Sequence, residues 1–325
     1  MANYYDIKGQ KVQNLATDPS PLAEGQVWYN TISNAAKFAG YNAAASWASG
    51  GSLNTARRQV AGFGGSPTTA VCVCGQNPPA LANTEEYSGT SWANVTANPQ
   101  VRVKPFGTGT LTAGLVGGGE SPSPSSGTNS GEYDGTSWTN SATIPLTMYD
   151  SVAFGPISAA VVTHGPQSPD TAVLLYASGG TWTTGNSSPQ KLGAGSGAGT
   201  QAAGIVMGES TIIANTFEYD SGTWSAGGSL NTGRARAASN VAASRDQAML
   251  FGGNYPPSTE LTNTELYDGT SWTNSVAMST ARRGLAGAGS TNTSALAFAG
   301  YTGSDTAATE QYEGAGTSTK TITTS

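Results

Sequence analysis

A ten-residue string that joins a tyrosine to a tryptophan recurs along this chain. Residues 263–272 read NTELYDGTSW, and residues 83–92 read NTEEYSGTSW. The tyrosine of this string returns every 43 to 48 residues, at Tyr87, Tyr133, Tyr176, Tyr219, Tyr267 and Tyr312. Self-similarity at a fixed period in this range is the signature of a repeat architecture, in which each copy is one supersecondary unit. The sequence therefore predicts six such units in a row.

Each repeat contains segments that are typical of β-strands. A short apolar run ending in glycine, such as residues 248–253, precedes the tyrosine segment, and another strand begins at the tryptophan. Short apolar or alternating runs bounded by Gly, Asn, Ser and Pro indicate strands. The Asp268-Gly269 pair between the tyrosine and the tryptophan indicates a tight hairpin turn. Four short antiparallel strands per unit of this length form the blade of a β-propeller, so we expect an all-β, six-bladed propeller with four-stranded blades.

The repeated aromatic residues are the expected packing material of the blades, because large aromatic side chains bury the most area and still bring a polar group to a partner. We assign this role to Trp47, Trp92, Trp138, Trp182, Trp224, Trp272, Tyr87, Tyr133, Tyr219, Tyr267 and Tyr312.

The order of features within a repeat resembles that of the kelch repeat. An arginine, an apolar run to glycine, Glu-x-Tyr and then Trp follow one another over roughly residues 52–325. The resemblance implies a kelch-like propeller.

The first and last repeats are each incomplete. Tyr312 has no tryptophan after it, whereas Trp47 has no tyrosine segment before it. The Trp47 strand is therefore expected to complete the last blade, which leaves no exposed sheet edge between first and last repeats. The alternative is that the Thr-rich stretch 317–325 forms this strand. With the first reading, residues 1–40 are a separate segment and residues 41–325 are the propeller.

Residues 1–40 lie outside the repeat and predict little more than an extended segment and a β-hairpin over residues 25–38. So short a segment builds little core alone. The strings YYDIKGQKVQNL, DPSP and EGQVWYNT resemble the N-terminal leader of virion-associated proteins of tailed phages. This resemblance implies a segment for virion attachment or oligomerisation, whose contact residues we expect to be Tyr4, Tyr5, Ile7, Trp28 and Tyr29.

Composition excludes several classes of function. The formal net charge is −6 and only 10% of the residues are charged, which disfavours nucleic acid as a partner. The sequence has no apolar run of about 18 residues, so we expect no membrane insertion. His164 is the only histidine, which excludes a multi-histidine metal site. We expect no cofactor and no metal. Cys72 and Cys74 are expected to be buried free thiols on one face of a strand.

Two sets of repeated charged residues allow more than one role. Asp134, Asp220 and Asp268 stand where carboxylates stabilise tight turns, although repeated cation ligands are the alternative. The arginines occupy the equivalent point of three repeats, as Arg57-Arg58, Arg234 and Arg236, and Arg282-Arg283. They either bond carbonyl groups between blades or ring the central channel and hold an anion. Variable loops at residues 76–82, 120–130, 166–170 and 254–261 are expected on one rim, where binding tends to occur.

These features lead to a functional expectation. The chain is expected to be a non-enzymatic structural protein of a tailed-phage virion, such as a tail fibre, decoration or other appendage, assembled in the host cytoplasm. Residues 1–40 contact other virion proteins, and several copies per particle raise avidity for a host surface glycan or protein. The alternative is a glycan-cleaving, sialidase-like propeller enzyme.

Overall fold

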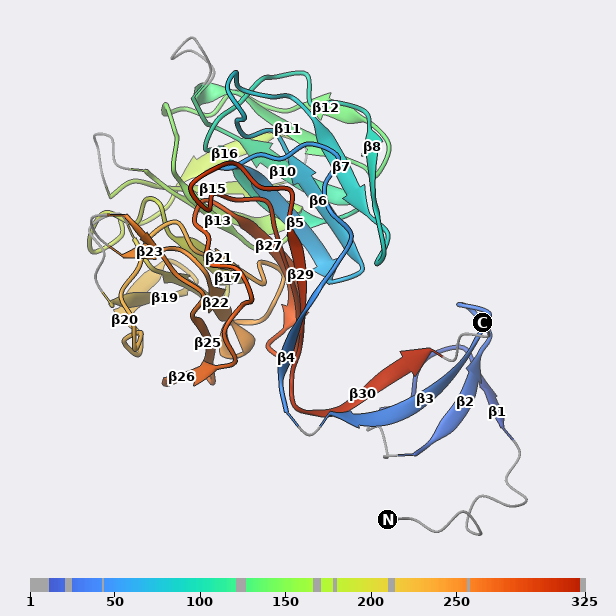
Figure 1. Cartoon of the computed structure of the whole chain (residues 1–325). Helices are drawn as coiled ribbons and strands as arrows, with labels where there is room; N and C mark the ends of the chain where they lie inside the picture. Colours follow the sequence, from blue (N-terminus) through green and yellow to red (C-terminus); the bar gives the residue numbers. More distant parts are fainter. Residues whose placement is uncertain are drawn as a thin grey trace. The chain divides into compact units, whose positions relative to one another are not determined.

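The chain forms two compact units in a computed structural model that describes residues 12–20, 25–42, 44–120, 127–165, 171–177, 180–209, 214–255 and 258–321. The large unit spans Trp47–Tyr312, and the small unit combines Met1–Ser46 with Glu313–Ser325 (Figure 1). Within the described residues, no helix is long and apolar enough to cross a membrane.

Six four-stranded sheets form the large unit, and each is one blade of a propeller. In the first five blades, the four strands follow one another in sequence and in space. The first three blades are β5 (Ala61–Ser66), β6 (Thr69–Val73), β7 (Thr84–Tyr87) and β8 (Trp92–Val95); β9 (Phe106–Thr110), β10 (Ala113–Gly117), β11 (Ser130–Tyr133) and β12 (Trp138–Asn140); and β13 (Val152–Phe154), β14 (Ala160–Thr163), β15 (Val173–Ala177) and β16 (Thr181–Thr184). The predicted six-bladed, all-β fold is confirmed.

The second half of the ring contains three further blades and a small added hairpin. These are β17 (Ser196–Gly199), β18 (Gly204–Met207), β19 (Thr216–Asp220) and β20 (Thr223–Ala226); β21 (Ala238–Ser239), β22 (Met249–Phe251), β25 (Thr264–Tyr267) and β26 (Trp272–Ser275); and β27 (Ala286–Thr291), β28 (Ser294–Phe298), β29 (Thr309–Glu313) and β4 (Ser46–Ser49). The added hairpin pairs β23 (Asn254–Tyr255) with β24 (Thr259–Glu260). Two single 3-10 turns, η3 (Ile157–Ala159) and η4 (Arg245–Gln247), precede β14 and β22.

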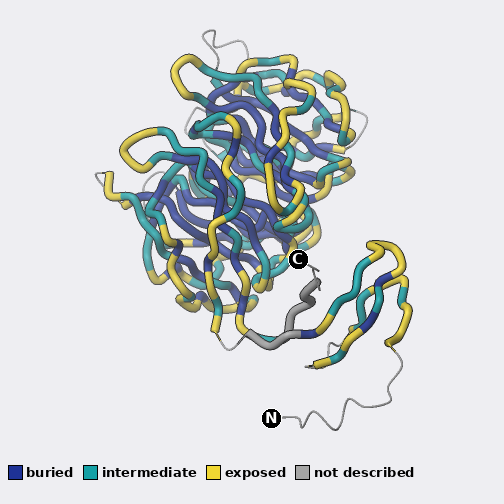
Figure 2. Tube along the Cα trace, turned by 45° about the vertical axis from the view of Figure 1, so that its right-hand side comes forward, coloured by how far each residue is buried: buried dark blue, intermediate teal, exposed yellow. Residues whose placement is uncertain are grey.

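The core lies between neighbouring blades, which explains the continuous apolar runs in the sequence. The second strands β6, β14, β18 and β28 are almost wholly buried (Figure 2). In β6, Cys72 packs in a cluster with Phe298, whereas Val71 and Val73 pack in a cluster with Tyr133. A strand that is covered on both faces needs apolar residues at consecutive positions, as in the sequence.

The two cysteines are buried free thiols, but they do not share a face as the sequence suggested. Cys72 belongs to the Phe298 cluster and Cys74 to the Tyr133 cluster. Cys74 follows the end of β6 and has a positive φ of 58°, so the strand's alternation no longer determines its direction.

Each repeated tyrosine packs on the tryptophan of its own blade. The ring centroids of these pairs lie 4.6 to 5.2 Å apart in all six blades. All six tyrosines are buried, as are Trp47, Trp92 and Trp272, whereas Trp138, Trp182 and Trp224 are half-buried. The indole N–H of Trp92 donates to Thr309 Oγ1 of the preceding blade at 2.9 Å, so these residues also join neighbouring blades.

The strand that contains Trp47 occupies the outer position of the last blade, beside β29. The alternative strand at the C-terminus lies elsewhere, because β30 (Gly316–Thr321) pairs with β3 (Ala35–Asn42) in the small unit. The predicted propeller range of 41–325 is therefore too long at its C-terminal end, and the small unit is not limited to residues 1–40.

The small unit is a four-stranded sheet in the order β1-β2-β3-β30. Its first two strands are β1 (Gln13–Leu15) and β2 (Val27–Asn30), which run parallel, while β2 and β3 form the predicted hairpin. On one face, the Asp18 carboxylate accepts hydrogen bonds from Trp28 Nε1 (3.0 Å), Asn30 Nδ2 (2.7 Å) and Lys37 Nζ (3.0 Å). Burial acts to raise the pKa of Asp18, but these hydrogen bonds outweigh it and lower the pKa.

Candidate ligand-binding face of the propeller

The innermost strands of the six blades contact one another in a closed cycle, β5-β9-β13-β17-β21-β27. Just before each of these strands, one residue has a left-handed backbone with φ between 49° and 60°. The six residues are Gln59, Lys104, Asp150, Ala194, Arg236 and Gly284. We call them the axial ring.

Backbone hydrogen bonds close this axial ring completely. The amide of each member donates to the carbonyl oxygen of the member one blade earlier, at distances of 2.6 to 3.2 Å. The amide of Gln59 closes the cycle by donating to the carbonyl oxygen of Gly284 at 2.7 Å. Because only main-chain atoms make these bonds, the side chains of the axial ring are not needed for it.

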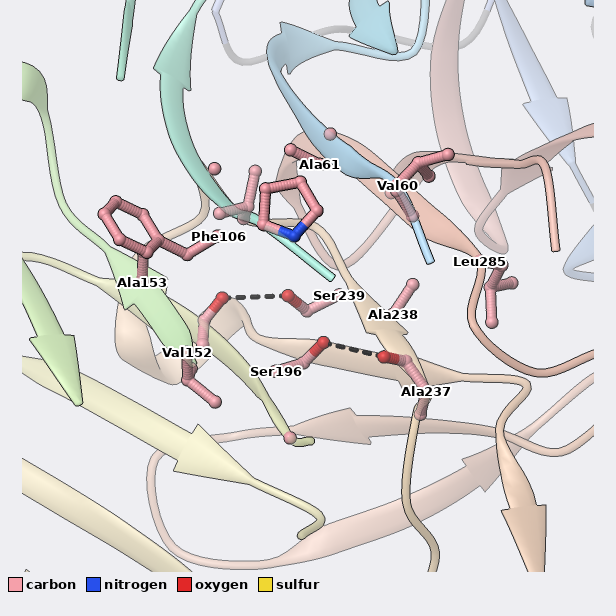
Figure 3. Close-up of a pocket in the computed structure, with 18 of the residues that line it drawn as sticks. Val60, Ala61, Phe106, Val152, Ala153, Ser196, Ala237, Ala238, Ser239 and Leu285 are labelled. Atoms are coloured by element: carbon pink, nitrogen blue, oxygen red, sulfur yellow. Dashed lines mark hydrogen bonds between the residues drawn. The ribbon is translucent and has the colours of Figure 1, made fainter. Parts of the chain in front are cut away.

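The channel that continues inward from this axial ring is narrow, and two of its serine hydroxyl groups are hydrogen-bonded within the protein. It encloses about 110 Å³ and is lined mainly by small residues of the six innermost strands (Figure 3). Two of its hydroxyl groups are engaged, because Ser196 Oγ donates to Ala237 O (2.9 Å) and Ser239 Oγ donates to Gly197 O (2.8 Å), whereas the buried Oγ of Ser151 has no hydrogen-bond partner among the described residues. The channel therefore offers no free polar group to a ligand at these two serines.

The first arginine of each repeated pair is structural. Arg234 is fully buried, and its Nη2 lies 2.9 Å from Glu265 Oε1 and 3.2 Å from the carbonyl oxygen of Leu250. The pairs Arg57–Glu85 and Arg282–Glu310 repeat this arrangement, each at 3.1 Å. Of the two roles that the sequence left open, these arginines bond carbonyl groups, but within their own blade and not between blades, and each also pairs with a buried carboxylate.

The Glu-x-Tyr segment was noted from the sequence, but its glutamate was not paired there with the arginine, although a signal for the pairing was present. The string Thr-Glu precedes the x-Tyr only at residues 84–85, 264–265 and 309–310, in the same three repeats that contain the arginine pair. In the second repeat, Gly131 replaces the glutamate, and Arg102 donates to the carbonyl oxygens of Gly118 (2.6 Å) and Asn129 (3.0 Å).

The second arginines instead converge on Tyr301. The guanidinium carbons of Arg58 and Arg283 lie 4.7 and 4.9 Å from the centre of the Tyr301 ring. Together with Arg236, they line a pocket of about 220 Å³ that also includes Gln59 and Gln76. We call this the arginine pocket. With its side-chain amide turned so that the oxygen faces Arg58, Gln76 accepts hydrogen bonds from Nε (3.0 Å) and Nη2 (3.1 Å).

The arginine pocket is lined by three guanidinium groups and, among the described residues, by no carboxylate. Arg58 is paired with Asp305 (2.6 Å) and Arg283 with Glu260 (3.0 Å). Arg236 has no carboxylate within ion-pair distance among the described residues, although it interacts electrostatically with Asp150. Guanidinium groups form planar, bidentate hydrogen bonds with carboxylate and phosphate, so the pocket suits an anionic group.

A second group of charges lies beside the arginine pocket. Lys104 Nζ is 3.4 Å from Glu120 and 3.6 Å from Asp150, so one ammonium group lies between two carboxylates. Burial raises the pKa of Asp150, while Lys104 and Arg236 act in the opposite direction. In the described part of the chain, no cluster of three or more His, Cys, Asp or Glu side chains is arranged to hold a metal ion.

The arginine pocket lies at the end of the propeller that carries the variable loops. Each such loop joins the second and third strands of a blade, so antiparallel pairing brings them to the end where the first strands begin. Bridges between Arg58 and Gln76 and between Ala235 and Asn254 show this proximity. The loop at residues 166–170, residues 121–126 of the 120–130 loop and residues 256–257 of the 254–261 loop lie outside the described residues.

The other singled-out residues have local roles. The carboxylate of Asp134 accepts the backbone amides of Thr136 (2.8 Å) and Ser137 (2.7 Å), and these bonds lower its pKa. Asp268 caps the same type of turn, whereas Asp220 instead pairs with Arg245 at 2.7 Å. His164 is buried, with its ring nitrogens 3.1 Å from the carbonyl oxygens of Gly165 and Thr147.

The expected contact residues of the N-terminal segment are only partly within the described chain. Tyr4, Tyr5 and Ile7 lie outside the described residues. Trp28 is fully buried and bonded to Asp18, so it is no exposed contact residue. Tyr29 is half-buried on the opposite face of β2, and its hydroxyl donates to Asn34 Oδ1.

Comparison with known proteins supports the fold. The propeller is similar to a solved structure described as "Structure of YjhT", with a TM-score of 0.63 and 16% sequence identity over 84% of this chain and 96% of that chain. YjhT is a β-propeller. No family model and no curated protein matches the sequence. At this identity, the likeness shows a shared fold and no more.

Proposed function

We propose that this chain is a non-enzymatic structural protein of a tailed-phage virion, which is attached through the small unit and displays the propeller for recognition. The observation that carries the proposal is the topology of the last blade. Strand β29 ends and β4 begins at the end of that blade opposite the arginine pocket, so both connections to the small unit leave the propeller there. The resemblance of the leader strings to phage virion proteins supplies the virion context.

The small unit offers a surface for attachment. Val27 and Phe38 are paired across β2 and β3, and their side chains are 40% and 36% exposed. Tyr29 lies on the same face, because side chains two residues apart on a strand point to the same side. Ile32, in the turn between the two strands, is 76% exposed. We assign this surface, Val27, Tyr29, Ile32 and Phe38, to contact with another virion subunit, and we call it the attachment face.

The arginine pocket is the recognition element that we assign to the propeller. Its unpaired Arg236 and its two further guanidinium groups favour a carboxylate or phosphate group on a host surface glycan or protein. Many copies on one particle raise the apparent affinity of such a small site.

The test uses phage particles assembled with variant chains. Val27→Asp places a charge on the attachment face, and Val276→Asp makes the same change at a propeller residue of similar exposure, 39%. We expect the Val27→Asp chain to fold and to be missing from purified particles, whereas the Val276→Asp chain is incorporated. Absence of the wild-type chain from particles, or normal incorporation of Val27→Asp, would overturn the proposal, as would turnover of a glycan substrate by the purified chain.

A further inference from the structure

The hydroxyl groups of the six repeated tyrosines have different hydrogen-bond partners in different blades. In three blades, the hydroxyl donates to a glutamate of the preceding blade: Tyr133 to Glu86 (2.6 Å), Tyr267 to Glu218 (2.5 Å) and Tyr176 to Glu132. Tyr87 instead accepts from Gln311 Nε2 (2.9 Å), and Tyr312 bonds Ser275 Oγ (2.7 Å). The Tyr219 hydroxyl has no hydrogen-bond partner in the described part of the chain, although Tyr219 is only 1% exposed.

Two replacements in the preceding blade explain this exception. Leu175 stands immediately before the tyrosine of its blade, where Glu86, Glu132 and Glu218 stand in others. Gly185 stands three residues after the tryptophan, in the position of Ser275. The third blade is the one that lacks both kinds of partner, because the fifth blade lacks the glutamate but retains Ser275.

A pocket of about 590 Å³ opens where these partners are missing. Leu175, Gly185 and Tyr219 all line it. Most of its other walls come from the turns between first and second strands and between third and fourth strands, which lie at the end of the propeller opposite the arginine pocket. Thr184 and Asn186, at and after the end of β16, complete the lining. Its volume is within the range of about 300–1,000 Å³ that is usual for small-molecule sites. We call it the interblade pocket.

The lining of the interblade pocket is polar but uncharged. It combines the hydroxyl groups of Thr184, Thr200 and Ser221 with the side-chain amides of Asn186 and Gln201. Asn186 is held in place, since its Nδ2 donates to Gly222 O (2.7 Å) and its carbonyl oxygen accepts from Trp224 Nε1 (3.2 Å). Leu175 and the Tyr219 ring supply the apolar part of the wall.

We propose that the interblade pocket binds a neutral saccharide. Sugar hydroxyls both donate and accept hydrogen bonds, as do the hydroxyl and amide groups of the lining, while the apolar C–H face of a sugar ring packs on Leu175 and Tyr219. An uncharged lining gives no electrostatic preference for an anion, in contrast to the arginine pocket. A sugar hydroxyl that reaches the Tyr219 hydroxyl, which lines the pocket, gives it a hydrogen-bond partner.

The chain supplies a variant that closes the pocket and a matched control. Leu175→Glu restores at Tyr219 the glutamate that other blades have, and it places a longer, charged side chain in the pocket. Leu266→Glu makes the same substitution at the equivalent position of the fifth blade. Gly185→Ser is a second, smaller closing variant, which restores the serine found at residue 275.

The experiment measures binding of maltotriose, cellotriose and N,N′-diacetylchitobiose to the full chain by saturation-transfer NMR and titration calorimetry. We expect at least one to bind, and we expect Leu175→Glu and Gly185→Ser to weaken that binding by about tenfold or more, while Leu266→Glu retains it. If Leu175→Glu fails to fold, Gly185→Ser decides. The inference is overturned if none of these sugars binds or if binding survives in the closing variants.

Discussion

The aromatic ring of Trp47 packs against that of Tyr312, with their centroids 5.2 Å apart. The other five blades contain the same tyrosine–tryptophan pair within one hairpin, but here the partners come from opposite ends of the propeller segment. Trp47 Nε1 also donates to Thr264 Oγ1 of the fifth blade at 3.1 Å. Trp47 therefore joins the two ends of the ring and also the last two blades.

Truncation of this tryptophan is expected to weaken the ring. For Trp47→Ala we expect the free energy of unfolding to fall by about 3–5 kcal/mol, the usual cost of a large aromatic truncation in a core. Equilibrium denaturation with urea measures it. Trp182→Ala, at a half-buried copy within a hairpin, is the control and should cost less. An unchanged stability of Trp47→Ala would mean that the ring closes without this pair.

At the buried Arg234–Glu265 pair, we expect replacement of one partner to lower the free energy of unfolding more than replacement of both. Glu265→Ala leaves a fully buried guanidinium without its carboxylate, so we expect a loss of about 3–5 kcal/mol. Replacing both residues with methionine should recover part of that loss, because no charge then remains buried, while the backbone amides of Asn231 and Thr232 still lack the carboxylate that accepts from them. A single variant as stable as the wild type would contradict the structural role of the pair.

Alkaline pH is expected to destabilise the propeller through its tyrosines. Burial, and then the hydrogen bonds to Glu132 and Glu218, raise the pKa values of Tyr176 and Tyr267 to about 12 from the ordinary value of 10. The folded state thus favours the neutral phenol, and this contribution is fully present below pH 10 and is lost as the pH rises through 12.

Near-ultraviolet absorbance of the phenolate, followed together with the unfolding free energy over the same pH range, checks this prediction. Tyr267→Phe removes one of the groups and should make the loss of stability less steep. A free energy of unfolding that does not change between pH 10 and 12 would contradict it.

The cysteines are expected to be unreactive in the native state. Burial raises the pKa of Cys72 to about 11 and that of Cys74 to about 12, so both thiols are protonated at neutral pH and inaccessible. The thiolate is the reactive form. We expect no labelling by iodoacetamide until the protein is denatured, and then labelling of both residues; rapid labelling of the native protein would show that β6 opens easily.

Sulfate is expected to bind the arginine pocket through Arg236. At a sulfate concentration ten times the dissociation constant, binding to the folded state adds about 1.4 kcal/mol to stability. Sulfate also stabilises folded proteins by exclusion from their surface, so the measurement is the difference between wild type and Arg236→Gln. Equal stabilisation of both proteins would show that Arg236 holds no anion.

Much of the fold could be predicted because its determinants are local and repeated. The tyrosine period gave the number of blades, and the missing partners of Trp47 and Tyr312 indicated the closing strand. The sheet to which residues 316–321 belong was harder to predict, since an alternating Thr-rich stretch could form an edge strand of the last blade or of the sheet in the small unit. Its actual partner, β3, lies almost the whole chain away in sequence.

The candidate sites were harder to predict because they depend on differences between repeats. The sequence drew attention to the arginine pairs but did not separate their buried first members from the second members at Tyr301. The interblade pocket arises where Leu175 and Gly185 take the place of polar residues, and such a replacement becomes meaningful only when the partner of Tyr219 is known. The axial ring has no shared residue type, so no sequence pattern reveals it.

The axial ring is closed by main-chain hydrogen bonds among Gln59, Lys104, Asp150, Ala194, Arg236 and Gly284. The side chains of these six residues therefore contribute to the surface at the centre of the propeller and not to the closure of the ring. Six different side chains already stand on one repeated main-chain geometry. Positions of this kind tolerate exchange, apart from β-branched residues, which fit a left-handed backbone poorly. Substitutions at these positions can therefore change the charge and polarity at the centre of the propeller one blade at a time, while the main-chain hydrogen bonds that close the ring stay the same.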